Sequence, residues 1–511
     1  MSMSKSRINL PTGYVQSAFA KYATLFFAVL IFHTIGTWSI PLIDRDEPRF
    51  AEASREMTEH GDYVVPYFNN QRRLDKPPLT YWAQTASYRI FGENDFAARS
   101  PSALAAALTA LLIFAWGRRI GGEKLGWWAA IIFTLSLQTF VHAKAAVADM
   151  WLVLFVTLAH RSGYELMQFP TLNARGSRLN SEEINQTSKI KNQTSLWWWT
   201  FYLSLALGFL AKGPIAWIPL LTVGSTILFV RGVPLARQFK FVRGILLVLA
   251  VVALWGVPAL TRTYGEFFFV GIGRNVVGRS FATMEGHGPS SFGMYLLLLP
   301  FYFITVFVTF FPWSIKIPYL TARLWQRRDK IDDYLLAGVV IIFAIFTFVT
   351  TKLPHYTLPA FPLLALLFAR GLLARNATTF LRNCAAVSAA AYLVIALVVP
   401  PLVARTFPAY QLFHQSRAYL QPNMQFGSVQ FDEPSLVWYF RGSVRGFLAP
   451  LNRRSIAGFM AAPGPRFVIV PSSLSAMLFA DHPENWKFFS TRGFNIANGK
   501  LVDLTLALKP E

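Results

Sequence analysis

The sequence predicts a mainly α, polytopic membrane protein that ends in a small extracytoplasmic α/β domain. Three observations predict this class: the composition, a series of long apolar runs, and a change of character near residue 407. Of the 511 residues, 54% are hydrophobic and only 14% are charged, whereas a soluble protein carries about 25% charged residues. Many apolar runs are roughly twenty residues long, which is the length that a helix needs to cross a bilayer.

The net charge of +22 is spread over short segments between the apolar runs. This distribution is the positive-inside pattern of cytoplasmic loops, and part of it suits a phosphate-bearing lipid. We therefore expect membrane lipids, and no nucleic acid, among the partners. The single cysteine, Cys384, lies in an apolar run, which excludes an intramolecular disulfide and a multi-cysteine metal site.

The alternation of basic and apolar segments predicts the topology. Lys5, Arg7 and Lys21 place the N-terminus in the cytoplasm. The first apolar run, 19–42, is too long for the core of a signal peptide and is interpreted as a helix. Counting onward predicts about eleven transmembrane helices, with about thirteen as the upper number. The polar, basic stretch 161–195 is expected to be a cytoplasmic loop with local disorder.

Two domains are expected. Residues 1–405 form the transmembrane domain, which includes a long outer loop at 44–99. Residues 406–511 form the α/β domain outside the membrane. Its expected strands are 425–431 and 466–470, which are bounded by Pro and Gly turns. A helix is expected in the same domain soon after the second strand, from Ser473 to Ala480.

The outer loop opens with a dense run of charges from Asp44 to Glu52 and continues to Asp75-Lys76-Pro77-Pro78. A membrane protein normally has an inert loop at this position. Asp46 is expected to cap a short helix that runs through Glu59, with Pro48 in the first turn, where its missing N–H is harmless.

The topology also brings polar residues from six loops or helix ends to the outer face, and such costly placement indicates a shared site. A carboxylate there can act as a general base toward an acceptor hydroxyl, and Lys and Arg can stabilise the charge on a departing phosphate. The chain has no GxxxxGK[ST] motif, so the energy must reside in the donor, and the chemistry suits a phosphate-bearing lipid. The outer-face residues are Asp44, Asp46, Glu47, Arg49, Asp75, Lys76, His142, Lys144, Asp149, Lys212, Glu285, His287, Lys352, His355 and Tyr356.

At these residues the sequence resembles the GT-C class of integral-membrane glycosyltransferases. The matching motifs are Asp46-Glu47-Pro48-Arg49-Phe50-Ala51-Glu52, Gly61 to Pro66, Lys76-Pro77-Pro78-Leu79-Thr80-Tyr81-Trp82, Lys212-Gly213-Pro214, and Lys352 to Pro359. The chain is most similar to the bacterial branch that contains the aminoarabinose transferases of lipid A, which are related to protein O-mannosyltransferases.

The resemblance implies a glycosyltransferase that takes a sugar from a polyprenyl (undecaprenyl) phosphate donor and inverts the anomeric carbon. The acceptor would be lipid A or another lipid or envelope glycan. The active site and the C-terminal domain would face the periplasm from the bacterial inner membrane. The alternatives are a multi-pass lipid or sugar transporter or flippase, a non-catalytic assembly factor, and an oligosaccharide ligase with a lipid pyrophosphate donor.

The resemblance also assigns roles to residues. The candidates are Asp46 and Asp149 as catalytic acids, Arg49, Lys76, Lys352 and Tyr356 at the donor phosphate, and Glu47 and Lys212 as further site residues. As alternatives, Asp46 could act only as a helix cap, and the two lysines 212 and 352 could extend to the outer headgroups. The sequence identifies no cofactor with certainty. A divalent cation remains open, with Asp75 and His287 as candidate ligands; Asp75 stands where the aminoarabinose enzymes tend to have Glu.

Overall fold

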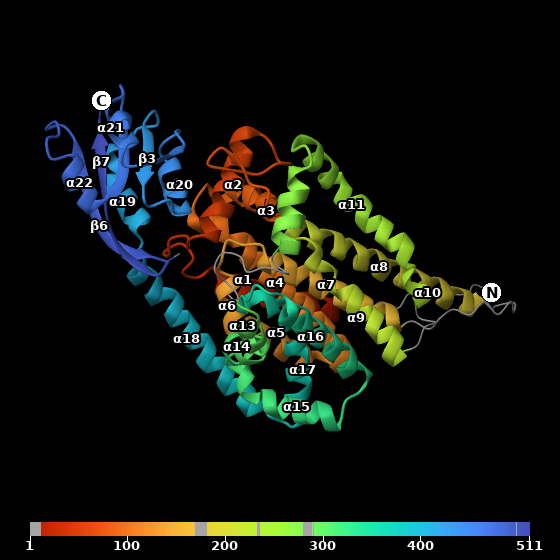
Figure 1. Ribbon diagram of the computed structural model, residues 1–511. Coiled ribbons are helices and arrows are strands. Elements are labelled where there is room, and N and C mark those ends of the chain that lie inside the picture. The colour runs from red at the N-terminus through yellow and green to blue at the C-terminus, as the bar shows by residue number, and fades with distance from the viewer. Residues whose placement is uncertain are drawn as a thin grey trace.

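The computed structural model describes residues 12–168, 181–231, 236–278, 289, 291–496 and 498–510. It consists of a helical bundle followed by a C-terminal domain with a mixed sheet (Figure 1). The mainly α class and the C-terminal sheet domain predicted from the sequence are thereby confirmed.

The bundle is built from apolar helices that proline and glycine interrupt repeatedly. Gly213 has a positive φ and ends α8, and Pro214 then begins a short 3₁₀ turn. The bundle elements are α1 (Thr12–Thr34), α2 (Asp46–His60), β1 (Tyr67–Phe68), β2 (Gln71–Arg72), α3 (Leu79–Phe91), α4 (Asp95–Gly121), α5 (Glu123–Thr134), α6 (Leu137–His142), α7 (Asp149–Gln168), α8 (Ser181–Lys212), η1 (Pro214–Trp217), α9 (Ile218–Thr226), η2 (Ile227–Arg231), α10 (Ala236–Phe239), α11 (Phe241–Arg262), η4 (Phe268–Gly278), α13 (Phe292–Leu297), α14 (Phe301–Thr309), η5 (Trp313–Lys316), α15 (Ile317–Gln326), α16 (Lys330–Phe348), η6 (Pro354–Ala360), α17 (Phe361–Ala374) and α18 (Thr378–Ala404).

Within the described residues, five helices are long and apolar enough to cross a membrane, or six if one bent pair counts as a single span. The central ones, α4 and η6–α17, are largely buried inside the bundle, whereas α11 and α18 are apolar but mostly exposed. Exposed apolar helix surface of this kind is what contact with lipid requires. The higher count of about eleven remains a prediction. The five spans are Asp95–Gly121, Ala236–Arg262, Lys330–Phe348, Pro354–Ala374 and Thr378–Ala404.

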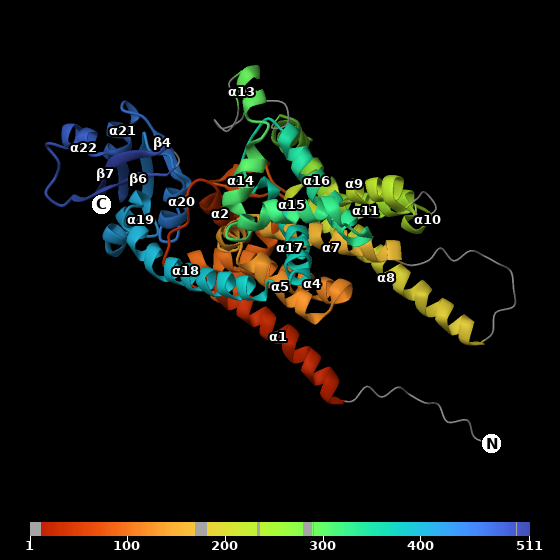
Figure 2. The ribbon, with the colours of Figure 1, turned by 90° about the horizontal axis from the view of Figure 1, so that it is seen from below.

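Two local predictions need correction. The helix expected after the first span is present as α2, but its N-cap is Arg45 and Asp46 is already its first residue. The stretch 161–195 is also more helical than expected, because α7 continues to Gln168 and α8 begins at Ser181. Residues 169–180 of this stretch lie outside the described residues, so the local disorder expected there remains a prediction. The N-terminal part of α8 extends away from the bundle in Figure 2.

The C-terminal domain contains a five-stranded sheet with the order β4-β3-β5-β7-β6. Strand β3 pairs in parallel with β4 and β5, and β7 pairs antiparallel with β5 and β6. The two strands and the helix expected from the sequence are present as β3, β5 and α22. The elements are α19 (Pro408–Ser416), η7 (Arg417–Tyr419), β3 (Gln425–Val429), α20 (Pro434–Arg441), β4 (Leu448–Leu451), α21 (Ser455–Ala461), β5 (Arg466–Pro471), α22 (Ser472–Leu478), β6 (Lys487–Asn495) and β7 (Lys500–Lys509).

The segment containing α2 and α3 lies between the bundle and the sheet domain, where α2 packs against α20 (Figure 1). Their shared core includes Ala51 of α2 and Leu436, Val437 and Phe440 of α20. The predicted outer loop therefore lies at the junction of the bundle and the sheet domain, where Glu52 of α2 contacts Arg441 of α20 across 389 residues of sequence.

A close approach of two helices gives a test of the bundle. A Cβ atom on Gly117 of α4 would lie 2.7 Å from the Cα atom of Gly126 in α5. Because that neighbour is backbone, it cannot move aside, and small residues permit such helix contacts in membranes. We expect Gly117→Ala to cost about 1–3 kcal/mol, measured as a lower unfolding temperature in detergent. In the matched control Gly224→Ala the new Cβ would meet no atom within 4 Å, so an equal loss there would contradict this packing.

Candidate active site

Glu47 is buried and forms the central ion pair of the outer loop. Its carboxylate pairs with Arg99 at 2.6 Å, and both side chains are at most 5% exposed. The same carboxylate accepts hydrogen bonds from the backbone N–H groups of Ile43 and Ala146 at 2.8 and 2.6 Å. Both carboxylate oxygens of Glu47 are thus occupied by hydrogen bonds within the protein. These contacts hold the start of α2 against neighbouring segments. The role of Glu47 as a further site residue remains a prediction.

Asp46, the residue before it, has the opposite environment. It is exposed in the first turn of α2, and in the described part of the chain it makes no hydrogen bond or ion pair. Its charge acts on Arg73 and Tyr81, which lie across the loop. Arg49, one turn further along α2, is half-buried and acts on Asp75. The carboxylate of Glu47 therefore stabilises the fold, whereas that of the neighbouring Asp46 is exposed and, among the described residues, unpaired.

Asp75 belongs to a second group in the same loop. Its carboxylate lies 3.1 Å from Nε of Arg73, and the same Nε donates to the hydroxyl of Tyr81 at 3.0 Å. Burial acts to raise the pKa of Asp75, but the cations Arg73, Lys76 and Arg49 outweigh it and hold that pKa below its ordinary value. Asp75, a candidate metal ligand, thus already pairs with Arg73, and a cation would have to compete with that arginine. The other candidate, His287, lies outside the described residues, as does Glu285.

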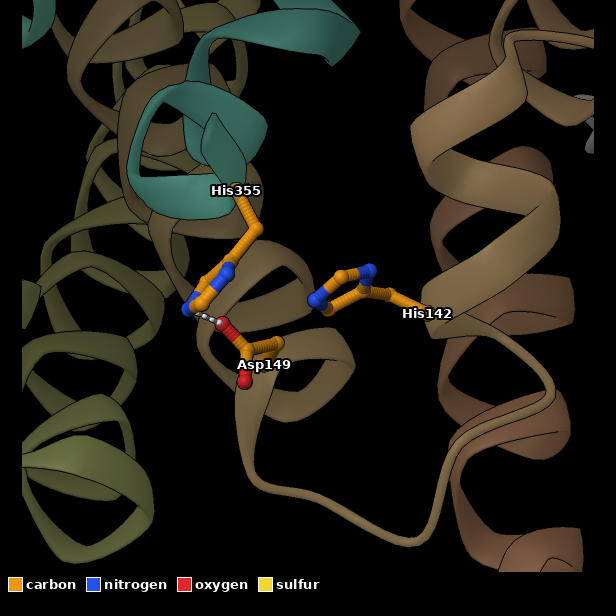
Figure 3. A group of neighbouring side chains, drawn as sticks. All are labelled: His142, Asp149 and His355. Carbon is orange, nitrogen blue, oxygen red and sulfur yellow. Dashed lines mark ion pairs between the residues drawn. The ribbon is translucent and has the colours of Figure 1, made fainter. Parts of the chain in front are cut away.

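Asp149 begins α7 and faces His142 and His355, which come from other segments (Figure 3). Lys212, the last residue of α8, donates to its Oδ1 atom at 2.5 Å. Nε2 of His355 lies 3.8 Å from the same oxygen, and the ring of His142 lies 4.9 Å from that of His355 between centroids. The structure thus brings two predicted site residues, Asp149 and Lys212, together with two histidines.

Lys76 connects the loop to this group. It is half-buried and acts electrostatically on both Asp75 and His355. We call the combined set the polar cluster; it consists of Asp46, Arg49, Arg73, Asp75, Lys76, His142, Asp149, Lys212 and His355. Most of the predicted site residues therefore fall in one region.

The other two phosphate candidates have different surroundings. The ammonium of Lys352 is buried and donates to the carbonyls of Phe346 and Thr347 at the end of α16, at 3.2 and 2.5 Å. Lys144 caps α1 in the same way through Phe32 and Ile35. Cations near a helix C-terminus satisfy its free carbonyls. Tyr356 is half-buried, and its ring packs against Phe346. Phosphate contacts by Lys352 and Tyr356 remain predictions.

Comparison with known proteins identifies the family. Residues 22–272 match the profile described as dolichyl-phosphate-mannose-protein mannosyltransferase. The undecaprenyl phosphate-alpha-4-amino-4-deoxy-L-arabinose arabinosyl transferase of Aeromonas hydrophila is 30% identical over 355 residues, which cover 68% of this chain and 58% of the relative. The chain belongs to the GT-C membrane glycosyltransferases. The resemblance stated from the sequence is thus confirmed.

Two further comparisons concern the extent of the likeness. Another relative of this GT-C protein, an uncharacterized protein of Aquifex aeolicus, is 26% identical over 346 residues, or 67% of this chain and 61% of that one. The chain therefore spans about 60% of the length of these relatives. ArnT from Cupriavidus metallidurans, solved bound to undecaprenyl phosphate, has the same fold: the TM-score is 0.72 at 17% identity, covering 97% of this chain and 98% of ArnT.

Sequence reasoning missed the partners that hold α2 of this GT-C protein in place. Glu52 is fully buried and pairs with Arg55 of its own helix at 2.7 Å and with Arg441 of α20. Arg441 also pairs with Glu59 at 2.6 Å. Burial raises the pKa of Glu52 to about 7, although both arginines act to lower it. Only the Glu spacing along one face of α2 could have indicated a buried basic partner, and nothing in the sequence locates that partner in the C-terminal domain.

Loss of Arg441 tests this connection. Arg441→Met leaves the buried carboxylate of Glu52 with Arg55 alone, so we expect a loss of about 3–5 kcal/mol and a lower unfolding temperature in detergent. Arg445→Met is the matched control, because Arg445 is exposed in the same domain. Equal stability of the two variants would contradict the connection.

A second contact between loop and tail predicts a pH dependence. Asp44 accepts hydrogen bonds from the backbone N–H and the hydroxyl of Ser435, at 2.9 and 2.6 Å. Burial raises the pKa of Asp44 to about 7, while the bonds from Ser435 act to lower it. The folded state thus favours the protonated carboxyl. That contribution to stability is present below the ordinary pKa of 3.8 and is lost as the pH rises through about 7.

Asp44→Asn keeps the hydrogen-bonding shape without the charge. We expect the unfolding temperature of the wild type to fall relative to this variant between about pH 5 and about pH 8, measured in the same detergent. Parallel profiles of the two proteins over this range would show that the Asp44 carboxyl does not titrate in the folded contact.

Proposed function

We propose that this GT-C protein transfers a sugar from a polyprenyl phosphate donor, undecaprenyl phosphate in bacteria, to lipid A or another extracytoplasmic glycan. In this proposal residues 1–405 form the catalytic membrane domain. Residues 406–511 form a domain on the periplasmic side of the inner membrane, which is also the side of the active site. The names of the A. hydrophila transferase and of the lipid-bound ArnT structure support the donor class.

One observation carries the proposal: the exposed carboxylate of Asp46 stands beside the cations of the polar cluster. General-base catalysis needs a carboxylate that is not already neutralised. Asp46 meets this condition, whereas Glu47 is paired with Arg99 and Asp75 with Arg73. Cations that stabilise a departing phosphate are needed close by, and Arg49 and Lys76 belong to the same cluster.

The proposed step is a single displacement at the anomeric carbon. Asp46 takes the proton of the acceptor hydroxyl, and the hydroxyl oxygen forms a bond to the anomeric carbon as the bond from that carbon to the phosphate oxygen breaks. The electron pair stays on the phosphate oxygen, so the products are the glycosylated acceptor, with inverted configuration, and polyprenyl phosphate. Arg49 and Lys76 offset the charge that develops on the phosphate.

Asp149 takes a supporting part in this proposal. Its ion pair with Lys212 joins the ends of two long helices, α7 and α8, at the edge of the polar cluster. We assign Asp149 and Lys212 to the shape and charge of the donor site, and Lys352 and Tyr356 to its border. The Asp46 carboxylate remains the proposed base.

Two substitutions test the assignment in vesicles that contain a sugar-loaded undecaprenyl phosphate and lipid A. Asp46→Asn is expected to lower the transfer rate by about 10²–10⁴, because it removes the base. Lys76→Ala is expected to lower it by about 10²–10³, because it removes charge stabilisation. Mass spectrometry of donor and acceptor measures the rate.

The controls are Asp481→Asn and Lys500→Ala, which make the same changes at exposed positions of the C-terminal domain and are expected to retain the wild-type rate. Wild-type transfer rates in both Asp46→Asn and Lys76→Ala would contradict the assignment of Asp46 as the base and of Lys76 to the donor phosphate. A donor that crosses the membrane with its sugar still attached, with no glycosylated acceptor, would favour a flippase.

A further inference from the structure

His142, Asp149 and His355 come from three separate segments and face one another. His142 ends α6, Asp149 begins α7, and His355 lies in η6, more than 200 residues later. Each offers one ligand atom, and all three atoms lie within 4.8 Å of one another. Figure 3 shows both imidazole rings and the carboxylate directed toward the same small space.

Direct hydrogen bonds do not explain this convergence. The 3.8 Å between Nε2 of His355 and Oδ1 of Asp149 exceeds hydrogen-bond length. The ring of His142 makes its hydrogen bond on the other side, where Nδ1 lies 2.9 Å from the side-chain amide of Gln138. Ligand atoms about 2.0–2.2 Å from a tetrahedral ion are about 3.3–3.6 Å from one another, so a small inward movement of the three side chains would suffice to bind an ion.

We propose that His142, Asp149 and His355 bind one divalent cation of the zinc type. Two imidazole nitrogens with one carboxylate form a ligand set that zinc favours, and three protein ligands leave a fourth position open. Magnesium and calcium prefer oxygen ligands throughout. The side-chain amide of Gln138 lies against Nδ1 of His142. A ligating histidine usually donates its other ring N–H, so when His142 binds zinc through Nε2 the Gln138 amide must present its oxygen to Nδ1.

Lys212 is compatible with this site because a carboxylate has two oxygens and several acceptor positions. Lys212 occupies Oδ1 of Asp149 at 2.5 Å and neutralises it when no ion is present. A cation at the site competes with that ammonium, so the lysine lowers the affinity for the ion. The arrangement favours an ion that is bound moderately and exchanges.

A second step of the inference rests on the proposed function. Lys76 acts electrostatically on His355, so the ion site adjoins the residue assigned to the donor phosphate. An ion with an open position there would bind a phosphate oxygen and add positive charge where the departing phosphate forms. The site would then strengthen donor binding without supplying the base.

Zinc binding to the full-length protein in detergent tests the site. After treatment with a chelator, the protein is titrated with zinc in competition with a chromophoric chelator, and bound metal is counted by elemental analysis. We expect a single zinc ion per chain. His142→Ala and His355→Ala should each lose more than about 100-fold in affinity, and Gln138→Ala about 10–100-fold.

His414→Ala is the matched control, because this histidine is exposed in the C-terminal domain, and it should bind zinc as the wild type does. Lys212→Gln should bind zinc more tightly. Absence of zinc from the wild type, or unchanged affinity in both His142→Ala and His355→Ala, would overturn the site.

The binding of undecaprenyl phosphate, measured with and without zinc, tests the second step, and equal affinities would overturn it. Failure of the site and failure of the proposed function are distinguishable. Zinc binding by a protein that transfers no sugar refutes only the function, and transfer by a protein that binds no zinc refutes only the site.

Discussion

The buried ion pair between Glu47 and Arg99 is the interaction on which the outer side of the molecule depends. Arg99 also donates to the carbonyls of Thr37, Ile40 and Pro41, which lie in the segment that follows α1. Arg99, near the start of α4, thus joins that helix to the segment after α1 and to the start of α2, and Glu47 extends the connection to the segment before α7. Breaking a buried pair leaves an uncompensated charge, so these four segments are held in one arrangement.

That arrangement explains why neighbouring acids in one motif have different environments. Because Glu47 points inward to Arg99, Asp46 at the preceding helical position points elsewhere and stays exposed. Further along α2, Glu52 faces Arg441 of the C-terminal domain. The helix therefore has one face that binds the bundle and one that binds the tail, and the exposed carboxylate stands at the boundary between them.

The helical class, the start of the outer helix and two strands of the tail could be predicted from the sequence, because each depends on local composition and periodicity. The gathering of Asp149 and Lys212 could also be anticipated, since both follow or begin apolar runs on one face. The pairing of Glu47 with Arg99, of Asp75 with Arg73 and of Glu52 with Arg441 could not. Such pairs depend on how the helices rotate and pack, and one sequence gives no signal that selects a given arginine over the many others.

The last membrane helix sets the position of the tail. At 27 residues, α18 is about 40 Å long, more than the roughly 30 Å of a hydrocarbon core. Only three residues separate its end at Ala404 from α19. The sheet domain is thus held close to the end of α18, because so short a connection does not allow it to swing away as a tethered module would. Under the proposed function, with the sheet domain at the outer surface of the membrane, an acceptor embedded in the bilayer reaches the outer loop from the side, whereas a large soluble acceptor first meets the tail.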